Sequence, residues 1–153
     1  MGADKTLSTE AGAELILKNH LNRIPKEWDF CLIDTPPALG LLSLNALSAA
    51  QEVLIPVETR IMALQGLMQL TKTIQTVRDR LNPTLEILGV LPCRVDKRTR
   101  LSQDVIKELK KRLGEKLLPI YIRESVKMLS APHLLNLSLF TIQRGLEPKI
   151  FAA

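Results

Sequence analysis

The sequence of 153 residues has few of the residues that build metal centres or disulfide frameworks. It contains two cysteines, Cys31 and Cys93, two histidines and no C-x-x-C pair. Each cysteine lies inside an apolar run, where a thiol usually behaves as a small buried hydrophobe. Two dispersed thiols argue against a structural zinc site and against an iron–sulfur cluster. This cysteine usage is typical of a reducing, cytoplasmic environment.

Long apolar runs and glycine-rich loops are also missing. No stretch of about 18 uncharged apolar residues could span a bilayer. The first fifteen residues lack the apolar core of a signal peptide, and the last nine are too weakly amphipathic to bind a membrane surface. The seven glycines are scattered, and none begins the string G-x-x-x-x-G-K-[ST], whose backbone amides cradle phosphates. We therefore expect no membrane partner and no phosphate-binding loop within these residues.

What the chain does have is a concentrated positive charge. The formal net charge is +5, and residues 94–127 hold eleven Lys and Arg against five Asp and Glu. This segment therefore accounts for the whole surplus. Such a concentration suits a polyanionic partner such as nucleic acid. A solvated, lysine-rich helix face would have the same composition, so charge alone leaves both interpretations open.

Apolar segments and amphipathic segments alternate along the chain. Strands that are apolar throughout are typical of sheets covered on both faces, and strands alternating with helices form parallel sheets through right-handed crossovers. The predicted fold class is therefore α/β, a parallel sheet flanked by helices. We expect one domain, with residues 1–27 as a helical lead-in to residues 28–153. The predicted strands are 29–34, 52–57, 86–92 and 117–122, and the predicted helices are 10–22, 39–50, 62–81 and one that begins at Ser102 as its N-cap and ends before Gly114.

The most informative local pattern is an apolar strand that runs into Asp34 and then into Thr35, Pro36 and Pro37. Proline cannot continue a helix or a central strand, so the chain must turn there. A carboxylate at the end of a strand is the kind of ligand that Mg²⁺ prefers, because this hard ion favours oxygen. Many α/β strands also end in an acid that only caps the next turn. On its own, the pattern fits either role.

A longer stretch around this motif resembles a known family. Residues 28–70, WDFCLIDTPPALGLLSLNALSAAQEVLIPVETRIMALQGLMQL, resemble the ParA/MinD family, specifically its Soj-like branch for chromosome and plasmid partition. The resemblance continues through residues 80–109, RLNPTLEILGVLPCRVDKRTRLSQDVIKEL, and weakens beyond them. It covers about residues 10–132 in all. It implies a phosphate-loop (Rossmann-like) NTPase fold, of which this chain would hold an incomplete, C-terminal part.

The resemblance also implies roles for individual residues. Asp34 would be the Walker B acid that holds Mg²⁺ through water, and Thr35, Pro36 and Pro37 would begin the catalytic switch segment. The loop that approaches the nucleotide base would include Arg94, Val95, Asp96, Ile122 and Arg123. Non-specific DNA binding would involve Arg98, Arg100 and Lys127, since such binding needs only cations that reach phosphates. For each basic residue, a solvated side chain or a local ion pair is the alternative.

By the same resemblance, the family works with ATP and Mg²⁺, as a homodimer, on non-specific DNA and with a ParB-like partner protein, in the cytoplasm at the nucleoid. The chain departs from the family in two places. The loop K-G-G-x-G-K-[ST] that opens the family is missing, so we expect this truncated chain alone to be unable to hydrolyse ATP. Without the preceding segment, we also expect strand 29–34 to have an open edge. After Ala131-Pro132 the family's Ser-His-Gly-x-Pro loop is missing, and Arg123 replaces a proline of the base-contacting loop.

Three functional hypotheses remain open from the sequence. The chain could be part of a partition ATPase whose nucleotide-dependent DNA binding needs an N-terminal half. It could be a non-catalytic module that binds DNA or protein through residues 94–127 without regard to ATP. It could also be a degenerate remnant of such an ATPase with no activity, which the C-terminal departures favour.

Overall fold

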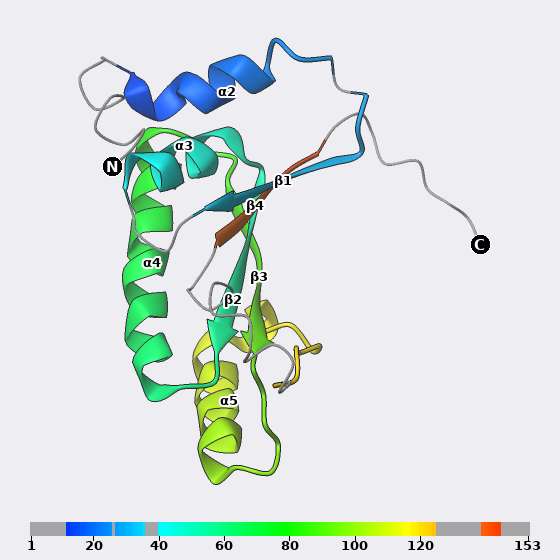
Figure 1. Ribbon diagram of the computed structural model, residues 1–153. Helices are drawn as coiled ribbons and strands as arrows, with labels where there is room; N and C mark the ends of the chain where they lie inside the picture. The colour runs from blue at the N-terminus through cyan, green and yellow to red at the C-terminus, as the bar shows by residue number, and fades with distance from the viewer. Residues whose placement is uncertain (1–11, 26, 36–39, 125–138, 145–153) are drawn as a thin grey trace, which may run out of the picture.

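The computed structural model describes residues 12–25, 27–35, 40–124 and 139–144 (Figure 1). No described helix is long and apolar enough to cross a membrane. In chain order the elements are a 3₁₀ turn η1 (Ala13–Leu15), α2 (Ile16–Leu21), β1 (Phe30–Thr35), α3 (Leu41–Ala49), β2 (Glu52–Glu58), α4 (Ile61–Arg80), β3 (Glu86–Cys93), α5 (Arg100–Leu113), a 3₁₀ turn η2 (Gly114–Lys116) and β4 (Leu139–Arg144).

The four strands form one sheet in the order β1-β4-β2-β3. Strands β2 and β3 are parallel, as the sequence predicts, whereas β4 is antiparallel to both β1 and β2. The sheet is therefore mixed, although β1, β2 and β3 all run in the same direction. The α/β fold class is confirmed, but the sequence did not predict β4. Its residues, LFTIQR, include three polar side chains and do not form one of the continuous apolar runs on which the other strands were predicted.

Two local predictions are wrong. Residues 117–122 do not form a strand. They run beside β3, and this stretch makes only isolated bridges, from Val90 to Leu117 and from Val95 to Arg123. Regular pairing is interrupted because Pro119 has no backbone N–H to donate. Helix α5 begins one residue after Thr99, whose side chain accepts a hydrogen bond from the backbone N–H of Ser102 at 3.3 Å. Thr99 is thus the N-cap in place of Ser102. The end of α5 is as predicted.

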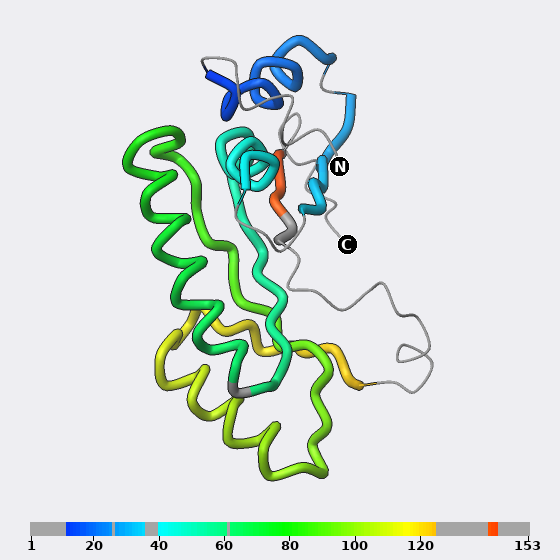
Figure 2. Tube along the Cα trace, turned by 60° about the vertical axis from the view of Figure 1, so that its left-hand side comes forward, coloured from blue at the N-terminus to red at the C-terminus, as the bar shows by residue number. Residues whose placement is uncertain are grey.

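The hydrophobic core lies between the helices and one face of the sheet. Alternate residues of β2 (Val53, Ile55 and Val57) point into it and are fully buried. Residues of α3, α4 and α5 pack with them in a single cluster, and Figure 2 shows these helices gathered beside the strands. The helical members of the cluster are Leu47 of α3, Leu67, Leu70, Ile74 and Val77 of α4, and Val105 and Leu109 of α5.

The opposite face of the sheet has less cover from the described residues. Over β3, Leu118 lies so close to Gly89 that a Cβ added there would be 2.7 Å from the Leu118 Cδ2 atom, which explains the glycine. Over β1 the apolar side chains are open to solvent: Phe30 is 59% exposed and Leu32 is 66% exposed. The expectation of a sheet covered on both faces therefore fails at β1.

Two buried asparagines fasten α3 to the segments that pack around it. Asn45 of α3 accepts a hydrogen bond from the Leu17 backbone N–H (3.0 Å) and donates to the Ala13 carbonyl (2.6 Å), which holds η1 and α2 against α3. Asn82, after α4, donates to the carbonyls of Leu47 (2.9 Å) and Ala50 (2.6 Å). These bonds satisfy carbonyls at the end of α3 and fix the turn into β2. The Asn82 bonds therefore hold the amino end of β2, opposite to the end where the pocket described next is built.

Candidate functional site

The carboxyl ends of β1 and β2 lie at different levels of the sheet. Asp34 of β1 and Leu54 of β2 are both paired with the backbone of residue 140 in β4, so they lie at the same level. Strand β2 continues for four more residues, to Glu58. At about 3.3 Å per residue, the end of β2 lies roughly 13 Å beyond Asp34 along the strand direction. The predicted site residues are therefore divided into two groups.

The first group is centred on Asp34. Its side chain is exposed at the end of β1, while Thr35 is buried, and Pro36 and Pro37 lie outside the described residues. Among the described residues, no three His, Cys, Asp or Glu side chains are placed to hold a metal ion together. One exposed carboxylate does not make a protein-built Mg²⁺ site, because Mg²⁺ also needs water and phosphate ligands. The residues that the structure describes therefore do not fit a complete ATP–Mg²⁺ site.

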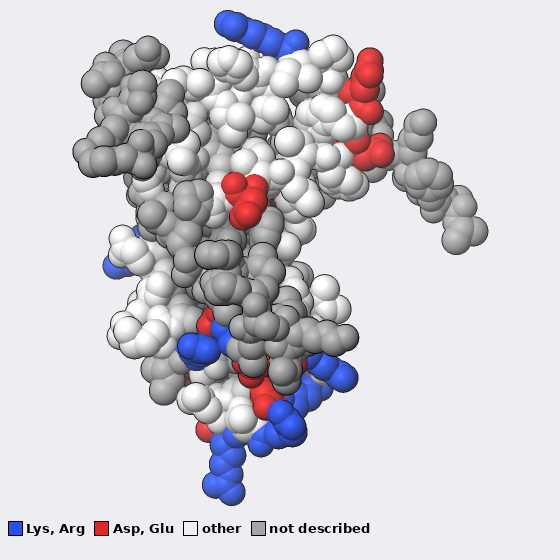
Figure 3. Space-filling model, viewed as in Figure 1, with Lys and Arg blue, Asp and Glu red and all other residues white. Residues whose placement is uncertain are grey.

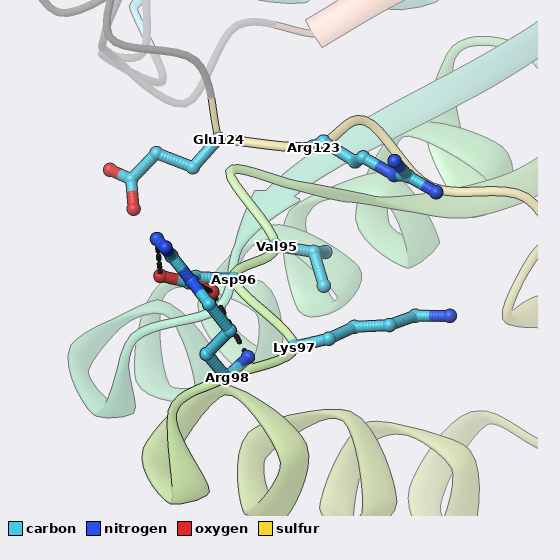
Figure 4. Close-up of a pocket in the computed structure, with 6 residues that line it drawn as sticks. All are labelled: Val95, Asp96, Lys97, Arg98, Arg123 and Glu124. Atoms are coloured by element: carbon cyan, nitrogen blue, oxygen red, sulfur yellow. Dashed lines mark hydrogen bonds and ion pairs between the residues drawn. The ribbon is translucent and has the colours of Figure 1, made fainter.

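The second group forms a pocket at the carboxyl ends of β2 and β3. Its volume is about 250 Å³. The segment after η2 closes one side, because the Ile122 N–H donates to the Pro92 carbonyl (2.9 Å) and the Val95 N–H donates to the Ile122 carbonyl (3.0 Å). Figure 4 shows the lining side chains arriving from the loop after β3 and from this segment. They are Val95, Asp96, Lys97, Arg98, Arg123 and Glu124.

Arg94 does not line the pocket, but it connects the segments around it. Its guanidinium pairs with Glu58 (Nη1 to Oε1, 3.3 Å) and with Glu124 (Nη2 to Oε1, 3.0 Å), and its side chain is only 14% exposed. Its backbone has a φ of 53°, in the left-handed region that non-glycine residues rarely adopt. The Arg94 carbonyl accepts a hydrogen bond from the Thr59 hydroxyl at 3.1 Å. Arg94 thus joins β2, β3 and the segment after η2, and its charge is already neutralised by two carboxylates.

Asp96 and Arg98 pair with each other across the loop before α5. The Arg98 guanidinium donates from Nε to Oδ1 and from Nη2 to Oδ2 of Asp96, both at 2.9 Å, and the Arg98 backbone N–H also donates to Oδ1 at 3.0 Å. These hydrogen bonds lower the pKa of Asp96 to about 2. The structure therefore shows Arg98 in a local ion pair, the alternative to DNA binding that the sequence left open. Its side chain is still 90% exposed, so it can exchange this partner for an outside anion.

Lys97, in the loop after β3, lies over the ring of Tyr121, in the segment after η2. The Lys97 ammonium lies 4.6 Å from the centre of the Tyr121 ring, a cation–π distance. Hydrogen bonds from Lys97 and then Arg123 lower the pKa of the Tyr121 hydroxyl. The side chain of Ile122, which lies between Tyr121 and Arg123 in the sequence, is 42% exposed. Of the residues expected at a nucleotide base, Val95, Asp96 and Arg123 line the pocket, whereas Arg94 and Ile122 lie next to it in the chain and do not line it.

The predicted DNA-binding residues are only partly described. Arg98 and Arg100 are both exposed at the start of α5, and Lys127 lies outside the described residues. Further exposed lysines follow on α5, at Lys107, Lys110 and Lys111. Figure 3 shows basic side chains, with some acidic ones among them, gathered at the end of the molecule where α5 lies.

Sequence reasoning missed the acidic and hydroxyl partners of the pocket. Glu58 and Glu124 hold Arg94, and the Ser102 hydroxyl donates to the Thr59 hydroxyl at 2.9 Å in the buried space beneath the loop. Glu58 did carry a signal, because it ends an apolar strand just as Asp34 does. Glu124 carried none, since it lies beyond the predicted strand 117–122 and no local pattern includes it.

Comparisons with known proteins agree with this arrangement. The family model for an AAA domain matches residues 1–87. The chain is 41% identical over 143 residues to the chromosome-partitioning ATPase Soj of Treponema pallidum, a match covering 93% of this chain and 56% of the relative. It is 40% identical over 131 residues to the sporulation initiation inhibitor protein Soj of Bacillus subtilis, covering 86% and 52%. The chain therefore spans about half the length of the relatives it matches.

Solved structures show the same likeness. The cobyrinic acid a,c-diamide synthase of Mycobacterium smegmatis, with bound ADP and magnesium, superimposes with a TM-score of 0.74 at 37% identity, covering 81% of this chain and 51% of that one. Apo McdA of Cyanothece gives a TM-score of 0.73 at 26% identity, covering 84% and 53%. The α/β fold predicted from the sequence is thus shared with these larger proteins.

Proposed function

Because the chain belongs to the ParA/Soj-like family of partition ATPases, we propose that it forms the C-terminal half of a nucleotide-dependent partition protein that acts on plasmid or chromosomal DNA. The observation that supports this most is the 41% identity to Soj over 93% of the chain, together with a built pocket where the family resemblance places the nucleotide base. ATP and Mg²⁺ are the proposed ligands, and a solved relative does hold ADP and magnesium.

In this proposal the pocket takes the base. Its volume of about 250 Å³ is just below the usual range of whole-ligand pockets, about 300–1,000 Å³, so it suits one part of a nucleotide. Asp96 and Arg123 offer an acceptor and a donor at its rim. The phosphates and Mg²⁺ would lie toward Asp34 and Thr35, and Pro36 and Pro37 would continue the switch. This chain alone lacks the loop that neutralises phosphates, so we propose that it neither holds ATP tightly nor hydrolyses it.

The proposed DNA surface is the start and outer side of α5. Arg98 and Arg100, together with Lys107 and Lys111, present exposed cations to phosphates, and Lys127 would extend the surface. This contact would be non-specific and would weaken with salt, because it depends on counterion release. We also propose that the protein acts as a homodimer at the nucleoid, together with a ParB-like partner protein.

A titration with duplex DNA tests the DNA surface. We expect the purified chain to bind at low salt, with affinity falling steeply as salt is raised. The double variant Lys107→Glu, Lys111→Glu should weaken binding at least tenfold, whereas Lys72→Glu, a charge reversal at an exposed lysine on α4, should have a much smaller effect. Equal losses in both variants would contradict a surface on α5.

A second titration, with labelled ATP and Mg²⁺, separates the proposal from its alternative. We expect no micromolar ATP binding by this chain alone, and micromolar binding would contradict the incomplete site. The alternative is a module that binds DNA or protein without ATP, and it is favoured by one observation: Arg94 and Asp96 are already engaged by side chains of the protein itself. If no DNA binds even at low salt, a module that binds DNA without ATP is excluded, whereas DNA binding that needs an N-terminal half is not.

A further inference from the structure

The cations in and beside the pocket fall into two groups. Arg94 and Arg98 are held by carboxylates of the protein itself. By contrast, neither Lys97 nor Arg123 forms an ion pair with a carboxylate in the part of the chain that the structure describes. Both of these residues are exposed. Their charges are therefore available to an anion from outside the chain.

These two cations converge on one uncharged group, the hydroxyl of Tyr121. The Lys97 ammonium lies 4.6 Å from the centre of the Tyr121 ring, and Lys97 and Arg123 both donate hydrogen bonds to the hydroxyl. Two positive charges that meet at one point repel each other, and a neutral oxygen offsets only part of this repulsion. An anion bound at the same point would offset more of it.

Backbone hydrogen bonds hold the two segments that carry these groups together. The loop after β3 and the segment after η2 meet in a parallel bridge between Val95 and Arg123. The Val95 N–H donates to the Ile122 carbonyl at 3.0 Å, and the Glu124 N–H donates to the Val95 carbonyl at 3.2 Å. The main chain therefore places the cations side by side, and their convergence does not depend on flexible side chains alone.

The two side chains also lie apart from the paired charges of the pocket. Figure 4 shows Lys97 and Arg123 extending in the same direction, away from Glu124 and Arg98. The carboxylates of the pocket are thus directed toward the paired group of cations, and Tyr121, which is half-buried, lies with the unpaired group.

We propose that Lys97, Arg123 and the Tyr121 hydroxyl form an anion site that takes one phosphate group. A phosphate group suits this set because it presents several oxygens, which can accept from an ammonium, a guanidinium and a phenol at the same time. The phenol then donates its proton to the ligand instead of only accepting from the cations. The site goes beyond the function proposed above, because it lies apart from the α5 surface and requires neither ATP nor a base in the pocket.

Tyr121 is the only tyrosine in the sequence, so a fluorinated tyrosine incorporated into the protein reports on this site alone. The labelled protein is titrated with inorganic phosphate at constant ionic strength, kept with sodium chloride, and followed by fluorine NMR. We expect the single signal to shift in a saturable way as phosphate replaces chloride. No shift, or a shift that does not saturate, overturns the proposal.

Charge removal tests whether the named cations hold the phosphate. The double variant Lys97→Met, Arg123→Met should weaken phosphate binding by about tenfold or more. The matched control Lys72→Met, Lys110→Met removes the same charge from exposed positions elsewhere and should weaken it by no more than about twofold. Lys97→Arg keeps the charge and should retain binding. Equal weakening in the two double variants would mean that phosphate responds only to overall charge, which overturns the proposal.

A short duplex DNA then identifies the source of the phosphate group. If the source is a nucleic-acid backbone, the duplex should shift the same fluorine signal and compete with inorganic phosphate. If the source is a free phosphate or a phosphomonoester, the signal should respond to inorganic phosphate and not to the duplex. The variant Lys107→Glu, Lys111→Glu keeps the two results separate: it should lose the DNA binding proposed for α5 and still respond to inorganic phosphate. Loss of the phosphate response in this variant would assign the anion to α5 and overturn the proposal.

Discussion

The part of the molecule built from β2, β3, α4 and α5 differs sharply from the part built from β1 and β4. In the first, the core residues of β2 are fully buried, and Asn82 spans the turn into β2 with two hydrogen bonds. In the second, Phe30 and Leu32 are exposed while Gln143 is buried with an unpaired oxygen. The first part buries its apolar side chains, whereas the second exposes apolar side chains to solvent and buries a polar atom without a hydrogen-bond partner. The difference indicates that β1 contributes less buried apolar surface to the fold than β2 does.

Removing a core side chain should change the free energy of unfolding more than any other substitution proposed below. Ile74 of α4 is 1% exposed within the main cluster, so Ile74→Ala should lower the free energy of unfolding by about 2–5 kcal/mol. Leu32→Ala on β1 removes a side chain that is already 66% exposed and should change it by no more than about 0.5 kcal/mol. Urea unfolding followed by circular dichroism measures both. A comparable loss in Leu32→Ala would mean that β1 belongs to the stable part.

Replacing the buried glutamine should have a smaller effect of opposite sign. Gln143→Val removes an acceptor that has no partner and places an apolar side chain against the helices, so we expect the free energy of unfolding to rise by about 1 kcal/mol. The control is Gln103→Val, at an exposed position on α5, which should not raise stability. A clear loss of stability in Gln143→Val would show that Gln143 makes a needed contact and that β4 fits its place.

The sequence predicted the stable part of the fold better than the open part, for a physical reason. In β2, α4 and β3 each residue's environment follows from its own segment: continuous apolar strands and a stripe of Leu, Ile and Val at helical spacing. Their predicted bounds agree with the structure to within one residue. Strand β4 exists because two distant strands leave a gap for it, and no local pattern in LFTIQR records that gap. Residues 117–122 were mistaken for a strand because their apolar character suggests one, although Pro119 prevents regular pairing.

The candidate site was predictable to a different degree in its two groups. A local pattern, an apolar strand that runs into an acid and then Thr-Pro-Pro, selected Asp34, whereas family resemblance alone selected Arg94. The structure then gave Arg94 two acidic partners, Glu58 and Glu124, that lie 36 and 30 residues away along the chain. A single sequence contains no sign that such distant charges meet. The offset of roughly 13 Å between Asp34 and the end of β2 is equally absent from the sequence, because it is set by the register of β4.

The smallest expected effect is a pH dependence at the pocket. Hydrogen bonds from Arg98 hold the pKa of Asp96 at about 2, below its ordinary value of 3.8. As pH falls below about 4, the unfolded chain takes up this proton before the folded one does. The stabilisation by the pair is therefore fully present above pH 4 and is lost as the pH falls toward 2. Exposure of Arg98 to solvent keeps it small.

The variant Asp96→Asn isolates this contribution. Its thermal midpoint should lie slightly below that of the unchanged protein at pH 7. The two midpoints should converge between pH 4 and pH 2, because protonation of Asp96 then removes from the unchanged protein the charge that the variant never carries. Asp104→Asn is the matched carboxylate control, on the exposed side of α5 where the Asp104 Oδ1 atom lies 3.6 Å from the Lys107 Nζ atom, and it should change the thermal midpoint at pH 7 by less. If the Asp96→Asn difference persisted unchanged at pH 2, the pair with Arg98 would not be its source. The loop before α5 would then be held by its backbone hydrogen bonds, as the rest of the stable part is.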